Sequence, residues 1–332
     1  MNFKVLTDPQ RYQKFVENAS NSMLYHTNNY LSFASDLLGC QVEILAWEVN
    51  NEIVAACPWL FKEGAFGKVY NSLAYYGANG GVLYTEVESV GPFIAEMEAY
   101  LTQVSTVHTQ ISNPFDEHLL VKSDFTQNRV AQITELPSQS EDSVVMEIFH
   151  SKTRNMVRKG LKEDVGVQVA TNLEFLAETH LQNMEALNVN PKGDEFFKLL
   201  PKYFTQGEDY QVFEALIENG KAAALLVFYH LNMVEYYMPA IHIDYRNKQA
   251  MSALILRVMQ DSIDKGYTIW NWGGTPISNE NLYRFKSRFG AIDKLYTIQG
   301  KVNDKSIFSH SIQKITDSYP GMFVVPFDML NP

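Results

Sequence analysis

The chain has 332 residues, 46% of them hydrophobic and 20% charged, which is typical of a folded globular protein. Its 20 Phe, 18 Tyr and 4 Trp residues exclude a mainly disordered chain, because so much aromatic surface is stabilised by burial. The length favours two domains, and a net charge of −11 disfavours nucleic acid and anionic lipid as partners unless basic residues cluster locally.

Targeting and cysteine signals are weak along the chain. Two cysteines, Cys40 and Cys57, provide neither a disulfide framework nor a metal site, and we expect two buried thiols. The N-terminus lacks a basic segment followed by an apolar one, so no signal peptide is predicted. The longest apolar run, 222–228, is too short to cross a bilayer. We therefore expect a cytoplasmic protein with no membrane insertion and no bound metal.

In the first half, strand and helix patterns alternate, which predicts an α/β (α+β) fold. Strands are expected over 42–49 and 53–61, flanking two asparagines that tolerate the positive φ of a tight hairpin turn. A glycine-rich stretch at 75–81 follows another strand-like segment. The polar, turn-rich segment 136–143 marks a seam, so we place a domain boundary near residue 140. The predicted domains are residues 1–140 and 141–332.

The second half gives clearer patterns. It predicts two strands, an amphipathic helix, a strand and a short helix, over 223–231, 234–243, 250–265, 267–272 and 279–289. Pro239 lies inside the second of these strands and removes one ladder donor, so strand pairing should loosen there. Gly266 should end the long helix.

The short helix carries an unusual lysine. Three apolar side chains share one helical face, and Lys286 lies about 70° from the centre of that face. An ammonium group in such a place is costly unless it meets an anion or loses its proton. Two interpretations stay open: a lysine whose stem covers Phe285 while its charge reaches water, or a positive group directed into a cleft.

A basic run precedes the second-domain strands. Five positive residues occur within eleven, and Arg154, Arg158 and Lys162 repeat at the spacing of one helical face. The run is either a solvated helix face or a site for phosphate or carboxylate, for which arginine provides bidentate contacts.

The remaining candidates are less specific. Along the 234–243 strand, alternation sends Glu235 and Tyr237 to one side. Strand aromatics are more often core, and the lone histidines His230 and His242 are more often structural than catalytic. The pair after the next strand, Gly273 and Gly274, forms either a tight turn or a place where a ligand approaches the backbone. No P-loop, dinucleotide fingerprint, zinc-protease motif or nucleophile elbow occurs.

Residues 270–275 followed by 282–290 resemble the closing motif of the Fem-type and related N-acyltransferases, in which a strand ending in Gly-Gly precedes Phe-Lys-x-x-Phe-Gly. Residues 151–167 resemble the basic helix at the entry to that family's second domain. Residues 25–39 and 72–81 resemble its first-domain segments. The specificity of the resemblance depends mainly on residues 270–290.

The resemblance implies two tandem GNAT-like (acetyltransferase) domains, each a twisted mixed sheet flanked by helices, with the active site in the second domain and a non-catalytic first domain. Members of this family transfer an acyl or aminoacyl group onto an amine of a cell-surface precursor. The donor is acyl-CoA in some branches and aminoacyl-tRNA in others. Residues 245–251 depart from the family pattern, because they lack the paired glycines of the usual CoA-pyrophosphate loop.

From this resemblance we expect an acyl-CoA-dependent N-acyltransferase that forms an amide on an amino sugar of a nucleotide-linked sugar, for O-antigen or capsule biosynthesis. The protein would be a monomer or small homo-oligomer. By analogy with the family motif, Lys286 would stabilise the oxyanion or a phosphate. Tyr237 is the candidate proton donor, and Glu235 or His242 the candidate base.

Further residues are expected to bind substrate or cofactor. They are phosphate ligands on the basic helix and the pyrophosphate loop, and pocket residues around the glycine pair: Arg154, Arg158, Arg246, Asn271, Trp272, Gly273, Gly274 and Tyr283. One alternative is an aminoacyl-tRNA-dependent aminoacyltransferase that acts on a peptidoglycan precursor. Another is a non-catalytic protein that binds a nucleotide sugar, because the pyrophosphate glycines are missing.

Overall fold

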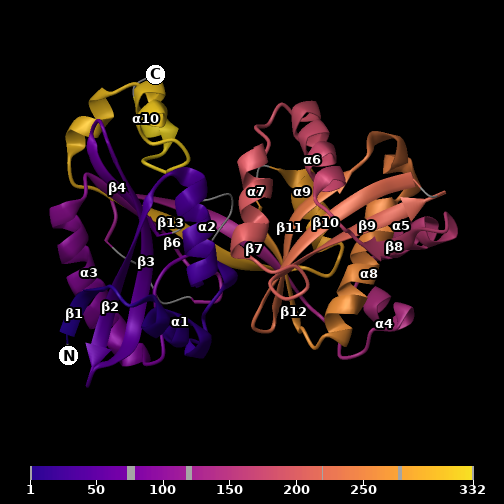
Figure 1. The fold of residues 1–332 in the computed structure, drawn as a ribbon, viewed down its shortest axis with the longest axis horizontal. Helices are drawn as coiled ribbons and strands as arrows, with labels where there is room; N and C mark the ends of the chain where they lie inside the picture. Colours follow the sequence, from indigo (N-terminus) through magenta and orange to yellow (C-terminus); the bar gives the residue numbers. More distant parts are fainter. Residues whose placement is uncertain (1, 73–78, 117–121, 219, 276–278, 331–332) are drawn as a thin grey trace. The chain divides into compact units, whose positions relative to one another are not determined.

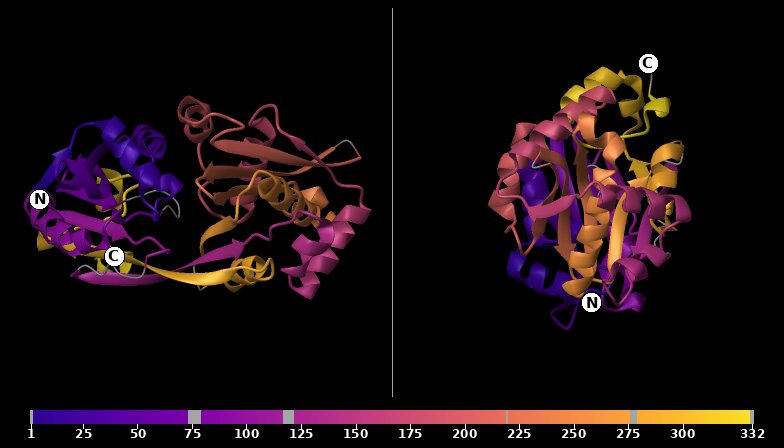
Figure 2. Two further views of the ribbon diagram at one scale, coloured as in Figure 1. Left: turned by 90° about the horizontal axis from the view of Figure 1, so that it is seen from below. Right: turned by 90° about the vertical axis from the view of Figure 1, so that its right-hand side faces the viewer.

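The computed structural model describes residues 2–72, 79–116, 122–218, 220–275 and 279–330. The chain forms two compact units: unit 1 is Met1–Val130 with Leu295–Pro332, and unit 2 is Ala131–Lys294. The last segment therefore returns to unit 1, where α10 lies with the N-terminal elements (Figures 1 and 2). Two consecutive segments divided near residue 140 were expected, whereas unit 2 is inserted into unit 1.

Unit 1 is built on a mixed sheet. Its strands pair in the order β1 (Asn2–Leu6), β2 (Gln41–Val49), β3 (Glu52–Gly64), β4 (Gly67–Ser72), β6 (Val107–Ile111) and the end of β13 (Ile292–Val302), and β5 (Leu83–Tyr84) pairs with β3. All these pairs are antiparallel except β4 with β6. The helices of this unit are α1 (Pro9–Asn18), α2 (Asn28–Leu38), α3 (Val90–Val104) and α10 (Ile312–Ser318), with short 3-10 turns at Leu24–His26, Val87–Ser89, Lys305–Ser309 and Phe327–Met329.

The hairpin predicted in this unit is confirmed. Asn50 and Asn51 have φ of 52° and 65°, and β2 and β3 pair on either side of them. Positive φ at both turn residues matches the right-handed twist of the flanking strands, and asparagine adopts it at low cost.

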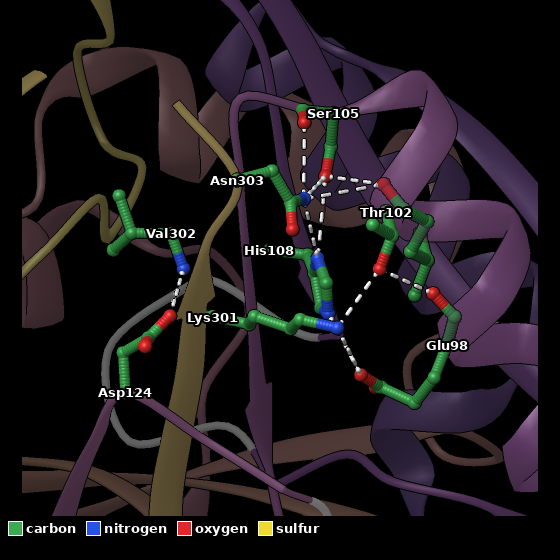
Figure 3. Close-up of polar contacts among 9 residues, drawn as sticks. Glu98, Thr102, Ser105, His108, Asp124, Lys301, Val302 and Asn303 are labelled. Atoms are coloured by element: carbon green, nitrogen blue, oxygen red, sulfur yellow. Dashed lines mark hydrogen bonds and ion pairs between the residues drawn. The ribbon is translucent and has the colours of Figure 1, made fainter. Parts of the chain in front are cut away.

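A polar cluster fastens the returning strand β13 to helix α3 (Figure 3). The Asn303 side-chain amide donates to the backbone carbonyl and hydroxyl oxygens of Ser105, both at 3.0 Å, and also lies 3.3 Å from Nδ1 of His108. Nε2 of His108 lies 3.2 Å from the Glu98 carboxylate. Ser105 is the C-cap residue of α3, whose last carbonyls have no intrahelical partner, and Asn303, the residue after β13, supplies a donor to it.

Unit 2 contains a second mixed sheet. Its strands are the last residues of β7 (Phe125–Glu135), then β12 (Ile269–Thr275), β11 (Met233–Ile241), β10 (Gly220–His230), β9 (Tyr210–Ile217) and β8 (Gly166–Val169). The helices are α4 (Asp142–Glu147), α5 (Ser151–Lys162), α6 (Glu174–Ala186), α7 (Asp194–Tyr203), α8 (Ala250–Asp264) and α9 (Glu280–Ser287), with a 3-10 helix at Ile243–Lys248. The predicted α/β fold class, a mixed sheet flanked by helices, is confirmed.

Helices cover both faces of this sheet (Figure 1). Helix α8 packs on β9, β10 and β11, and its Leu254, Ile255 and Met259 are fully buried in the core of the unit. Helix α6 contacts β10 and β11. Because strand side chains alternate, Val234 and Tyr236 join the core under α8, whereas Glu235 and Tyr237 point to the opposite face.

Candidate functional site

The two central parallel strands of unit 2 pair over only three positions. Residues 233–235 of β11 pair with 269–271 of β12, and the pairing ends at Glu235 opposite Asn271. Beyond this point β11 continues to Ile241 and β12 to Thr275 without pairing with each other in the described part of the chain. Along this unpaired part of β11, the Asn183 side chain of α6 binds both the N–H and the C=O of Ile241, and Pro239 has no N–H. The backbone groups open to a ligand therefore lie near the point where the strands part.

A buried carboxylate lies where the strands part. The Asn271 amide donates to Oε1 of Glu235 at 3.0 Å, and Oδ1 of Asn271 accepts from the Gly273 backbone N–H at 2.8 Å. Glu235 is 2% exposed and Asn271 is fully buried. The two bonds fix the Asn271 amide, so that it presents a donor to the carboxylate.

Tyr237 lies two residues further along the same face of β11. Its ring stacks on Phe196 of α7, with centroids 6.0 Å apart, and meets the edge of Phe228 at 4.9 Å. The ammonium group of Lys192 lies 5.0 Å from the ring centroids of both Phe196 and Tyr237. Burial lowers the pKa of Lys192 to about 7.

Lys192 was missed in the sequence. It lies between α6 and α7, in a segment without helical or strand periodicity, and no other basic residue nearby draws attention to it. The available signal was a lone lysine between Pro191 and Gly193, ahead of the aromatic residues of α7. Such a signal is weak because only the fold places the α7 segment against β11.

The two candidate bases lie far apart. His242 begins the 3-10 helix that follows β11, is partly exposed, and has Nδ1 3.8 Å from the Asp244 carboxylate. Seven residues of extended strand separate it from Glu235, which is about 23 Å. One reacting amine cannot reach both groups, and Glu235 is the one located where the strands separate.

Lys286 is far more buried than its helical position suggested, with 4% of its surface exposed. Its ammonium group donates to Oγ1 of Thr275 at 2.8 Å and to the Gly274 carbonyl at 3.3 Å. Burial lowers the pKa of Lys286 to about 8. Within the described ranges no carboxylate pairs with it, so this buried cation has only neutral acceptors. Thr275 lies beyond the turn at Gly273, whereas Asn271 lies before it.

The glycine pair turns the end of β12. Gly273 has a φ of +71°, a value that favours glycine. The turn brings Trp272 and Thr275 to the same neighbour strand: the Trp272 indole donates to Oγ1 of Thr134 at 2.8 Å, and Thr275 donates to the Gln132 side chain at 3.0 Å. Trp272 is buried in the core of unit 2, so its indole supports the strand and does not face a ligand.

The three arginines predicted to bind phosphate differ in their burial and in their hydrogen bonds. Arg154 donates to the Phe149 carbonyl at 2.6 Å and is partly buried. Arg158 is exposed, and its one hydrogen bond within the described ranges is a long one to Asn155. Arg246 is exposed in the 3-10 helix before α8. The Tyr283 hydroxyl, a predicted pocket group, donates to the Asp293 carboxylate at 2.6 Å.

The N-terminus of α8 is open to an anion. Its N-cap residue, Gln249, has a φ of 62° and makes no side-chain cap, so the first-turn N–H groups are available. Gly160 of α5 packs against this turn, where a Cβ would lie 2.8 Å from the Gln249 carbonyl. Although the paired loop glycines are absent, an uncapped helix follows the open strand β11. This arrangement fits the pyrophosphate and extended arm of a CoA thioester.

Comparison with known proteins assigns the class of this unit. Residues 149–287 match the sequence profile described as Acetyltransferase (GNAT) domain. A comparison with curated protein sequences finds no match. The matched residues include β11, α8, β12 and α9, and therefore contain Glu235, Asn271 and Lys286.

Three solved structures share the fold over nearly the whole chain. FemX aligns with a TM-score of 0.70 at 12% identity, covering 93% of this chain and 99% of FemX. The C-terminal domain of a putative lysylphosphatidylglycerol synthetase from Agrobacterium fabrum aligns with a TM-score of 0.56 at 11% identity, covering 96% and 98%. A tandem GNAT protein from the clavulanic acid biosynthesis pathway aligns at 0.51 and 10% identity, covering 91% and 98%.

These comparisons confirm the predicted enzyme class: the chain carries an N-acyltransferase domain of the GNAT type. The fold of the whole chain is similar to FemX and to a tandem GNAT protein. In the described residues no helix is long and apolar enough to span a membrane. The same residues contain no group of three or more His, Cys, Asp or Glu side chains that could hold a metal ion.

Proposed function

We propose that unit 2 transfers an acyl group from acyl-CoA to the amine of an amino sugar carried by a nucleotide, for the assembly of a surface polysaccharide. The observation that carries this proposal is the end of the β11–β12 pairing at Glu235 and Asn271. It leaves an open strand edge, a buried carboxylate and an uncapped helix in one continuous stretch of unit 2.

The donor would lie along this stretch. The amide groups of its extended arm would pair with the open edge of β11, and its pyrophosphate would meet the first-turn N–H groups of α8. Arg246, exposed in the preceding turn, would add a charge-assisted contact to phosphate. Lys248 is less available, because its ammonium group is paired with Glu163 at 2.6 Å.

Glu235 would act as the base. The amine attacks the thioester carbonyl, the new C–N bond forms, and Glu235 accepts the proton that the amine loses. The C–S bond then breaks, and the Tyr237 hydroxyl supplies a proton to the departing thiolate. Both side chains project from the same face of β11, which is the geometry that this division of roles requires.

Lys286 would bind an anion of the acceptor. Its partners, Gly274 and Thr275, lie beyond the turn at Gly273, whereas Glu235 pairs with β12 before that turn, which favours a phosphate of the nucleotide over the oxyanion. A buried ammonium group with neutral partners gains most from such an anion. Arg154 and the exposed Arg158 would bind further phosphates of the nucleotide. A nucleotide-linked acceptor is a cytoplasmic substrate, so we expect the protein to act there.

The test is release of free CoA thiol from acyl-CoA in the presence of a panel of nucleotide-linked amino sugars. The expected result is release that depends on one acceptor, with an amide product found by mass spectrometry. Failure across the panel, together with turnover on charged tRNA, would overturn the choice of donor.

The second candidate is an aminoacyl-tRNA-dependent transferase that acts on a peptidoglycan precursor. The resemblance to Fem-type enzymes and the fold similarity to FemX favour it, and the exposed basic face of α5 could attract the tRNA backbone despite the net charge of −11. Incubation with a mixture of aminoacyl-tRNAs and a peptidoglycan precursor, in parallel with the acyl-CoA assay, separates the two donors. If neither donor reacts but nucleotide sugars still bind, the chain is a binding protein.

A further inference from the structure

Unit 1 contains a cavity of about 270 Å³ that has no part in the site of unit 2. It lies between α10, the segment that follows α10, and the first half of β7. Most of its lining is apolar and includes Ile315, Tyr319, Met322, Val324 and Phe327. Apolar, concave spaces with a few polar groups are the usual form of sites for small molecules.

The wall formed by residues 322–327 is held in place by specific bonds. The Asn71 side chain donates to the Phe323 carbonyl at 2.7 Å and accepts from its N–H at 2.8 Å. The Tyr319 hydroxyl donates to the Gly67 carbonyl at 2.9 Å and accepts from the Phe66 N–H at 3.0 Å. Val324 is buried. These bonds fasten the wall to residues 66–71 at points on either side of Met322.

Strand β7 contributes two polar residues to the lining. Phe125, Gln127 and Arg129 lie on the same face of β7 because strand side chains alternate. Phe125 packs against Phe323, with ring centroids 6.1 Å apart, so this face points toward the cavity wall. Gln127 and Arg129 both line the cavity.

Arg129 is the single charged residue of the described lining. It is partly buried, and its guanidinium donates one hydrogen bond, to the Gln127 side chain at 3.0 Å. No carboxylate in the described ranges forms an ion pair with it. Its remaining donors form a planar fork of the kind that binds a carboxylate through two parallel bonds. An apolar cavity beside such a fork complements an amphiphile that has an apolar chain and an anionic end.

We propose that this cavity binds a medium-chain carboxylate, with its apolar chain inside the cavity and its carboxylate on Arg129. The cavity, about 270 Å³, is large enough for an apolar chain of several carbons, and its mostly apolar lining does not suit a nucleotide.

The test is isothermal titration of the full chain with decanoate and, separately, with decanol. We expect decanoate to bind to one site per chain and decanol to bind more weakly. Arg129→Met should weaken decanoate roughly tenfold or more while leaving decanol nearly unchanged. Lys314→Met is the matched control, because Lys314 is an exposed cation on α10 that does not line the cavity.

A blocking variant separates the cavity from other apolar surface. Thr316 lines the cavity from an exposed position of α10, so Thr316→Trp should fill the space without disturbing the fold, and both ligands should lose binding. Absence of decanoate binding to the unaltered chain would overturn the proposal. Equal losses in Arg129→Met and Lys314→Met, or undiminished binding by Thr316→Trp, would also overturn it.

Discussion

At the scale of single residues, Lys286 combines burial with a charge that no carboxylate of the described residues compensates. Its hydrogen bonds go to the neutral oxygens of Thr275 and Gly274, and its pKa is lowered to about 8 by burial. Near neutral pH it is still mostly protonated, so it can act as the cation that an anionic acceptor requires. The ammonium group loses most of its charge within one or two pH units above that pKa.

The first prediction is a loss of acceptor affinity as pH rises. Above pH 8 the Lys286 ammonium group loses its proton, so the KM for the nucleotide-linked acceptor should rise about tenfold between pH 7 and 9.5, with a smaller change in kcat. Lys286→Arg stays charged in this range and should remove the rise. Initial rates at varied acceptor concentration check this, and an unchanged profile in Lys286→Arg would contradict it.

Stability gives a second readout of the same group. Since the pKa of Lys286 is about 8 in the folded chain and 10.5 for the ordinary side chain, the unfolded chain binds more protons between these values. Stability should therefore rise with pH across this window. Lys286→Met should show a smaller rise in the urea midpoint from pH 8 to 10. Identical pH dependence in the two proteins would contradict the assignment.

The second prediction concerns the base. Glu235→Gln keeps the shape and leaves Oε1 as an acceptor for Asn271, but the side chain can no longer take a proton from the amine. We expect kcat to fall by about 10²–10⁴-fold with little change in thermal stability. His242→Gln is the control, because His242 lies at the far end of β11, and its rate should stay within about threefold. The reverse ranking would transfer the role of base to His242.

At the scale of elements, the close contact between α5 and α8 controls the open helix N-terminus. Gly160 allows the contact, because a Cβ there would lie 2.8 Å from the Gln249 carbonyl and 3.0 Å from Cβ of Ala253. Either α5 or α8 must shift to make room for a side chain at position 160. The same shift would move the N–H groups that we assign to the donor pyrophosphate.

The third prediction compares two helical glycines. Gly160→Ala should destabilise unit 2 by about 1–3 kcal/mol through overpacking and should raise the KM for acyl-CoA more than that for the acceptor. Gly91→Ala is the matched control, because a Cβ at Gly91 in α3 meets nothing within 4 Å. It should be neutral or slightly stabilising. Thermal unfolding and donor titration check both variants, and equal behaviour would contradict the packing argument.

Most helices and strands of unit 2 could be predicted from the sequence because the periodicity of each one lies within a single short segment. The apolar stripe of α8 and the strands β10 and β11 follow periodicities within ten to fifteen residues. Glu235 and Asn271 were named from their strand positions, but their mutual bond needs the β11–β12 register, which no local pattern contains. Lys286 was recognised as unusual, whereas its burial depends on β12 and β7 closing around the end of α9. The signal at Lys192, a lone lysine between a proline and a glycine, was too weak to use because only the fold places α7 against β11.

At the scale of the whole molecule, the sequence predicted two consecutive domains, whereas in the structure unit 2 is inserted within the sequence of unit 1. The turn-rich segment near residue 140 is real, since it lies between β7 and α4, but it falls inside unit 2. The return of the last segment depends on β13 pairing with β6. That contact joins residues far apart in sequence, which periodicity and turn signals do not record.

The fourth prediction follows from this insertion. A chain ending at Lys294 would lose the strand that pairs with β6 and the buried side chains Ile307, Ile315 and Tyr319, which belong to one apolar core with Val69 and Val107. The α3 end would also lose its cap from Asn303. Removing several large core side chains at about 2–5 kcal/mol each exceeds the stability of an ordinary domain. Unit 1 should therefore fail to fold cooperatively.

Hydrogen exchange measured by mass spectrometry checks this with spatial resolution. In the shortened chain, peptides from α3 and β6 should exchange as fast as in an unfolded chain. Asn303→Ala in the full chain is the milder companion. It removes the donor to the Ser105 carbonyl and should speed exchange at the α3 end while leaving α8 unchanged. Native-like protection of residues 90–111 in the shortened chain would contradict the prediction. It would show that unit 1 folds without its returning strand and that the C-terminal segment is not required for the core of this unit.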